Sequence, residues 1–200
     1  DVVLVSVINK LDEDESSKKF WSKNEKGVIS LIHISFKQFL EDHGFYKYCP
    51  EGTKAYVFVR VTNYLIDYTS EKEIKDFVLN HLLNLDDISV YNFFAERTRY
   101  FREEFLSLLS SIDVYFIADS KSSAYLYFKN CAVKVTPKEI TTIDYIDLGG
   151  YVWKDHVIDR NFTVMSDKKC DYMQFISNIC GADQERIKAM ESTIGYLMHG

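Results

Sequence analysis

The sequence contains few of the residues that usually separate folded segments. Its 200 residues include 8 glycines and 2 prolines, and no proline-rich or glycine/serine-rich linker divides them. Hydrophobic residues make up 46% and aromatic residues 15% of the sequence, a composition that supports a buried core and is not typical of a disordered chain. These values predict one large domain or two small ones, with any boundary in a short loop.

Long apolar runs and paired cysteines are also missing. The sequence has no apolar run of 18 residues and no signal-peptide core, so we expect no membrane span and no secretion, and we predict a cytoplasmic protein. Cys49, Cys131, Cys170 and Cys180 form no C-x-x-C pair. Their spacing argues against a zinc ribbon and favours reduced thiols.

The common catalytic signatures are absent as well. The sequence has no G-x-x-x-x-G-K-[S/T] phosphate loop, no G-x-G-x-x-G, no G-x-S-x-G and no H-E-x-x-H, and its histidines show no i, i+4 pairing, so we expect no metal site. His81 lies in the apolar stripe of a predicted helix, and we interpret it as structural. Four aspartates, Asp144, Asp147, Asp155 and Asp159, leave a metal-dependent nuclease or primase-like site open as an alternative, although acidic residues are also common in turns.

The order of patterns predicts an α+β fold with mostly antiparallel sheet segments and amphipathic helices. In the first part, 1–87, a charged flexible loop near 9–27 precedes a strand at 28–34. A helix then follows, capped by Ser35-x-x-Gln38 and ended by Gly44. Strands over 45–48 and 54–69 and a helix capped by Ser70-x-x-Glu73 complete this part. The second part, 88–169, has a long helix over about 90–110 and a hairpin turning at Asn130-Cys131. The third part, 170–200, is a helical pair.

The basic residues are candidates for nucleic-acid contact. The net charge is −6, which argues against a generally basic coat protein, but the acidic excess lies largely in the first 87 residues. Arg97, Arg99 and Arg102 alternate with Tyr100 and Phe101, as in sites that bind single strands. Arg99 and Glu103 could equally form an i, i+4 pair on a solvated helix. The remaining candidate contacts are Lys129, Lys134, Lys154, Arg160, Lys168 and Lys169.

The end of the sequence resembles a known protein family. The segment "FISNICGADQERIKAMESTIGYLMHG" is similar to the paired helices that precede the ATPase of phage- and plasmid-type primase-helicases, the superfamily 3 helicases related to poxvirus primase-helicase. The matching positions are Phe175, Gly181, Ile194, Gly195, Tyr196, Leu197, Met198 and His199. Upstream, "YFKNCAVKV" resembles a strand-turn-strand of that family, with Cys131 in place of the usual Gly, and segments 19–48 and 150–162 are similar to regions of such proteins from mobile elements.

The resemblance implies an N-terminal accessory module of a DNA primase-helicase from a phage, plasmid or mobile element. The module would engage single-stranded or forked DNA or couple the motor to replication proteins, within a hexameric full-length protein. ATP and Mg²⁺ are expected only for the ATPase domain beyond this sequence, which itself is expected to have no cofactor and no catalytic residues. A protein-interaction or oligomerisation module without DNA affinity is the alternative that the negative charge favours.

Overall fold

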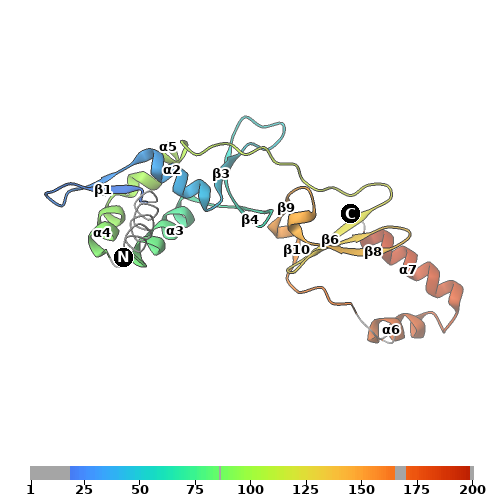
Figure 1. The fold of residues 1–200 in the computed structure, drawn as a ribbon. Coiled ribbons are helices and arrows are strands. Elements are labelled where there is room, and N and C mark those ends of the chain that lie inside the picture. The colour runs from blue at the N-terminus through green and yellow to red at the C-terminus, as the bar shows by residue number, and fades with distance from the viewer. Residues whose placement is uncertain (1–18, 86, 165–169, 199–200) are drawn as a thin grey trace, which may run out of the picture. The chain divides into compact units, whose positions relative to one another are not determined.

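The chain folds into two compact units (Figure 1). The computed structural model describes residues 19–85, 87–164 and 170–198. The first unit comprises the described residues up to Ile117 together with Leu148–His156, and the second comprises Ala118–Asp147 and the described residues from Val157 onward. Helices and mainly antiparallel sheets are both present, which confirms the predicted α+β class. The predicted boundary after residue 87 falls inside the first unit, and the predicted part 88–169 is divided between the two units.

The first unit contains a short hairpin and a four-stranded sheet. Strands β1 (Trp21–Lys23) and β2 (Ile29–Leu31) pair antiparallel, so the predicted loop 9–27 includes a strand, while residues 9–18 lie outside the described residues. The sheet has the order β3-β4-β5-β9, formed by β3 (Phe45–Tyr48), β4 (Val57–Thr62), β5 (Leu65–Tyr68) and β9 (Val152–Trp153). β3, β4 and β5 are antiparallel neighbours as predicted, and β9 joins β5 in parallel.

An aromatic core fills the first unit between this sheet and three helices, α2 (His33–Asp42), α3 (Glu71–Leu83) and α4 (Ile88–Glu96). The Phe20 ring is fully buried, and its centroid lies 5.2 Å from that of Phe36 and 5.4 Å from that of Phe94. His81 joins this cluster with its ring 4.6 Å from that of Phe39. Burial and, after it, the proximity of His43 lower the pKa of His81. These contacts agree with the structural role predicted for His81.

The two predicted capping boxes have different outcomes. The Ser70 hydroxyl accepts a hydrogen bond from the Glu73 amide, and the Glu73 carboxylate accepts one from the Ser70 amide at 2.7 Å, so this box is confirmed. The predicted box formed by Ser35 and Gln38 is wrong, because α2 begins at His33 and Ser35 lies inside the helix. The amide of Ile32, the N-cap residue, instead donates to the Phe20 carbonyl at 2.9 Å. A tertiary contact therefore sets this helix start, without a side-chain cap.

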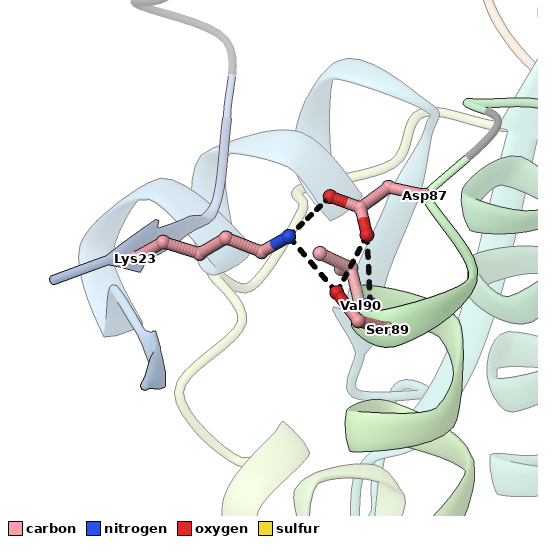
Figure 2. A network of polar contacts seen from close by, with 4 residues as sticks. All are labelled: Lys23, Asp87, Ser89 and Val90. Carbon is pink, nitrogen blue, oxygen red and sulfur yellow. Dashed lines mark hydrogen bonds and ion pairs between the residues drawn. The ribbon is translucent and has the colours of Figure 1, made fainter. Parts of the chain in front are cut away.

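A polar network joins β1 to the start of α4 (Figure 2). The Lys23 Nζ donates to Asp87 Oδ2 at 2.6 Å and to the Ser89 hydroxyl at 2.9 Å, and Asp87 Oδ1 accepts from the Ser89 hydroxyl and the Val90 amide. Asp87 thus caps the helix and forms an ion pair at once. The hydrogen bonds from Lys23 and Ser89 lower the pKa of the Asp87 carboxyl from 3.8 to about 2.

This network predicts a pH-dependent contribution to stability. Because the folded-state pKa of Asp87 is depressed, the contribution is present above the ordinary value of 3.8 and is lost as the pH falls through about 2. We expect Asp87→Asn, which keeps a capping side chain, to lower the thermal midpoint at neutral pH. The difference from wild type should shrink in acid, as measured by thermal unfolding from neutral pH down to about 2. Lys23→Met should show the same trend, and a difference that is independent of pH would contradict the prediction.

The second unit is built on the predicted hairpin. Strands β6 (Ala124–Phe128) and β7 (Ala132–Val135) pair antiparallel, β8 (Ile140–Ile143) extends them, and β10 (Val157–Ile158) joins β6 in parallel. Phe128 donates its amide to the Cys131 carbonyl at 2.9 Å, so the turn residues are Lys129 and Asn130, one position earlier than predicted. The Tyr145 hydroxyl donates to the Phe128 carbonyl at 2.7 Å, and burial raises the pKa of Tyr145 to about 12.

The predicted helical pair is present as α6 (Asp171–Ile179) and α7 (Gln184–Met198). Ile176 is buried, whereas Phe175 is 59% exposed and Ile179 is 54% exposed on the same helix. Near the end of α7, Tyr196 is 81% exposed, and a Cβ added at Gly195 would meet nothing within 4 Å. Each helix therefore presents apolar side chains to solvent.

Candidate nucleic-acid interface

The predicted long helix over 90–110 is wrong, because the chain breaks twice in this region. Helix α4 ends at Glu96, the 3-10 helix η1 (Thr98–Phe101) follows, and α5 (Glu103–Leu106) is a separate short helix. Arg97 and Arg102 occupy the two breaks with non-helical backbone angles. Phe94, Tyr100, Phe101 and Leu106 are all buried. A continuous helix would spread these four side chains around its circumference, whereas the breaks turn all of them toward the core.

The breaks also bring the three predicted arginines around one hollow. Arg97, Arg99 and Arg102, together with Glu96 and Thr98, line an open cavity of about 490 Å³. We call this surface the arginine loop. It belongs wholly to the first unit.

Aromatic rings fix two of the guanidinium groups. The Arg97 guanidinium lies 4.1 Å from the Phe93 ring centroid and donates to the Phe93 carbonyl at 3.2 Å. The Arg99 guanidinium lies 5.0 Å from the Tyr100 centroid and donates to the Tyr100 hydroxyl at 3.2 Å. Stacking of this kind limits the rotamers of a long side chain before any ligand binds.

The acidic neighbours neutralise the arginine loop only in part. Glu96 approaches Arg97 at 3.7 Å between charged atoms, with both side chains largely in solvent. The alternative Arg99 and Glu103 ion pair does not form among the described residues. Burial and then a hydrogen bond to Glu103 raise the pKa of the Tyr56 hydroxyl, which places the Glu103 carboxylate beside that tyrosine instead. Arginines in this arrangement can donate several charge-assisted hydrogen bonds to a phosphate.

Each of the other predicted basic residues that the structure describes contacts a carboxylate or an aromatic ring within its own unit. Lys154 belongs to the first unit and forms an ion pair with Asp67 at 2.6 Å. In the second unit, Lys129 pairs with Asp159 at 2.7 Å, and Lys134 and Arg160 each lie over an aromatic ring. The Lys129 amide also donates to the Arg160 carbonyl at 3.0 Å, so these two predicted residues are adjacent. Lys168 and Lys169 lie outside the described residues.

The four aspartates of the nuclease or primase-like alternative are divided between the two units. Asp155 belongs to the first unit, whereas Asp144, Asp147 and Asp159 belong to the second, where Asp159 is paired with Lys129. Within residues 19–85, 87–164 and 170–198, no three His, Cys, Asp or Glu side chains are grouped so that they could hold a metal ion.

Comparison of the chain with protein-family models, curated proteins and solved structures found no match. A functional argument for this chain therefore rests on its own residues. Among the helices that the structure describes, none has the length and apolar character needed to cross a bilayer.

Sequence reasoning missed a second group of polar side chains in the first unit. Arg60 and Asp67 face each other across β4 and β5, and Arg60 lies over the rings of Phe45 and Phe77. The available signal was a single cation, Arg60, among the valine and phenylalanine residues of the strand "VFVRVT". Such a residue must find a partner or a solvent-filled space when its neighbours are buried.

Proposed function

We propose that this chain is a DNA-engaging module and that the arginine loop contacts the phosphates of a single strand. The observation that carries this proposal is the break in the helix at Arg97 and Arg102, which gathers three arginines around one open hollow. Two of the guanidinium groups are held against aromatic rings, so part of the entropic cost of ordering them is met before DNA binds. Contacts to phosphate predict binding without strong sequence preference.

The resemblance to primase-helicases supports the larger context of the proposal. In that context the chain is the accessory module of a phage, plasmid or mobile-element helicase and works in the cytoplasm with replication proteins. ATP hydrolysis would belong to the ATPase of the full-length hexamer, because this sequence has no phosphate loop. The role of the arginine loop would be to hold the strand near the motor.

The arginine loop predicts weak, salt-sensitive binding. Each neutralised phosphate contributes a log-log salt slope of about −0.7 on a single strand, so three contacts give roughly −2. We expect a Kd on the order of micromolar or weaker at physiological salt. The triple variant Arg97→Ala, Arg99→Ala and Arg102→Ala should lose at least about tenfold in affinity at low salt. Fluorescence anisotropy of labelled single-stranded DNA over a salt series measures both effects.

A matched control separates the arginine loop from net charge. Lys26, Lys54 and Lys72 are exposed residues of the same unit, and their triple change to Ala removes the same charge. We expect this control to retain most of the affinity. Equal losses in the two triple variants, with unchanged circular dichroism, would show non-specific attraction and would contradict the proposed site. No binding by the wild type at about 50 mM salt would reject the DNA-engaging function itself.

The exposed apolar residues of α6 and α7 favour a second candidate function, a protein-interaction module. Phe175 and Ile179 lie one turn apart on α6 and are more than half exposed. Exposed apolar patches of this kind often mark protein contacts. If they bind a second copy, sedimentation should show association at high micromolar concentration that Phe175→Asp with Ile179→Asp abolishes while DNA affinity is unchanged. A wild-type chain that remains monomeric at all concentrations would reject self-association.

A further inference from the structure

The hollow of the arginine loop has an excess of positive charge. Of the five residues that line it, three are arginines and one, Glu96, is acidic, so three positive charges face one negative charge. The Glu96 side chain is 75% exposed and approaches Arg97 at 3.7 Å, and an ion pair so open to solvent is weak. The fifth residue, Thr98, is neutral and can donate its hydroxyl. The hollow therefore favours an anion.

Most of the donors of the three arginines are unused. The Arg102 side chain forms no hydrogen bond and no ion pair with any residue that the structure describes. Arg97 uses one N–H group for the Phe93 carbonyl, and Arg99 uses one for the Tyr100 hydroxyl. Because a guanidinium has five N–H donors, each of the three arginines retains several for a ligand.

Three guanidinium groups around one hollow suit a phosphate at the end of a strand better than one inside it. An internal phosphodiester has two non-bridging oxygens and a single negative charge. A terminal phosphomonoester has three such oxygens and a charge of about −1.5 to −2 at neutral pH. Three guanidinium groups can therefore each bind an oxygen of their own only on the monoester.

We propose that the arginine loop binds the terminal phosphate of a DNA single strand in preference to the phosphates inside the strand. This inference rests on the proposed function, since it takes DNA as the ligand, and it adds which part of the strand is held. An internal stretch would present one diester to each arginine, whereas a strand end would present a single dianion to all three. The same chemistry occurs at a 5′ or a 3′ phosphate, and the two ends can be tested separately.

Competition between unlabelled strands tests the preference without placing a dye at either end. Strands of about 12 nucleotides would compete with a labelled strand for the full chain. We expect a strand with a 5′ or a 3′ phosphate to compete at about tenfold lower concentration than the same strand with two hydroxyl ends. A hydroxyl-ended strand longer by about two nucleotides adds similar charge as diesters, and it should gain no more than about twofold.

The charge of the terminal phosphate gives a second readout. The second pKa of a phosphomonoester is about 6, whereas an internal diester stays singly charged. The ratio between the hydroxyl-ended and phosphorylated strands should therefore shrink when the pH falls to about 5. Glu96, the acidic residue that lines the hollow, acts on both strands, so the ratio isolates the protonation of the ligand.

Variants of Arg102 connect the preference to the hollow. Arg102→Gln should reduce the ratio from about tenfold to about twofold, and Arg102→Lys, which donates as a point charge, should retain only part of it. Lys72→Gln is the matched control, because Lys72 is an exposed cation of the same unit, and its ratio should equal that of wild type. An unfolded fraction lowers the apparent affinity for both strands alike, so it does not imitate a change in the ratio.

The outcomes distinguish this inference from the proposed function. Equal competition by phosphorylated and hydroxyl-ended strands overturns the preference, while binding of the labelled strand still supports the DNA-engaging function. A labelled strand that does not bind rejects both. A phosphoserine peptide that competes as well as the phosphorylated strand would show recognition of a phosphate monoester on a protein and would overturn the assignment to DNA ends.

Discussion

Replacing Gly44 by alanine should destabilise the first unit by on the order of 4 kcal/mol or more. Gly44 follows α2 with φ +85°, a left-handed conformation that costs an L-residue about 1–2 kcal/mol. The larger cost comes from packing, because a Cβ at this position would lie 2.1 Å from the Val61 carbonyl oxygen. That oxygen is backbone and cannot rotate away. The Val61 amide also donates to the Gly44 carbonyl at 2.8 Å, so relieving the overlap would break a hydrogen bond that joins the helix end to β4.

Gly52 provides the matched control for this experiment. It has nearly the same backbone angle, φ +77°, but a Cβ added there would meet nothing within 4 Å. Gly52→Ala should therefore show the conformational cost alone, about 1–2 kcal/mol. Urea denaturation of the wild type and both variants measures the difference. Equal losses in the two variants would mean that β4 does not approach Gly44 as closely in solution as the structure shows.

Local signals explain the parts of the fold that the sequence predicted well. The Ser70 and Glu73 capping box, the glycine after α2, and the β6 and β7 hairpin each depend on residues that are close together in the chain. The same is true of α6 and α7, whose apolar residues recur at helical spacing. In these places the local preference and the tertiary structure agree.

Tertiary contacts explain where the sequence prediction was wrong. The start of α2 is set by the Phe20 carbonyl, which lies outside the helix in sequence. The region over 90–110 has no glycine or proline to mark a break, and its helix ends because buried aromatic residues on either side of Arg97 and Arg102 must all reach one core. β9 reaches the first unit only after the chain has contributed β6, β7 and β8 to the second. No short window of sequence contains that information.

The candidate site residues also differ in whether local sequence or tertiary contacts determine their surroundings. Arg97, Arg99 and Arg102 could be selected from sequence because they are close together and alternate with aromatic residues. Lys154 was selected as a separate charge, and its structural role beside Asp67 could not be inferred. The stacking of Tyr68 on Trp153 depends on the parallel pairing of β9 with β5, which joins residues far apart in the chain. Sequence reasoning could therefore not find contacts that depend on this pairing.

Replacing Phe94 by alanine should destabilise the first unit by about 3–5 kcal/mol. Phe94 is fully buried, and its ring lies 5.4 Å from that of Phe20, 5.1 Å from that of Phe93 and 6.0 Å from that of Tyr100. Truncation would remove most of a large apolar side chain and leave a cavity that surrounding rings can fill only in part. Phe93 and Tyr100 are also the rings on which Arg97 and Arg99 stack, so the space would open directly beneath the arginine loop.

Ile88→Ala tests whether burial causes the loss. Ile88 begins the same helix and is 72% exposed, so its truncation should change the free energy of unfolding by no more than about 0.5 kcal/mol. Urea denaturation followed by circular dichroism measures both variants. At a temperature where Phe94→Ala remains folded, its affinity for single-stranded DNA should be lower than that of wild type, because the rings that hold two guanidinium groups have lost support. Unchanged affinity together with the expected loss of stability would show that the arginines bind DNA without the order that the aromatic stacking provides.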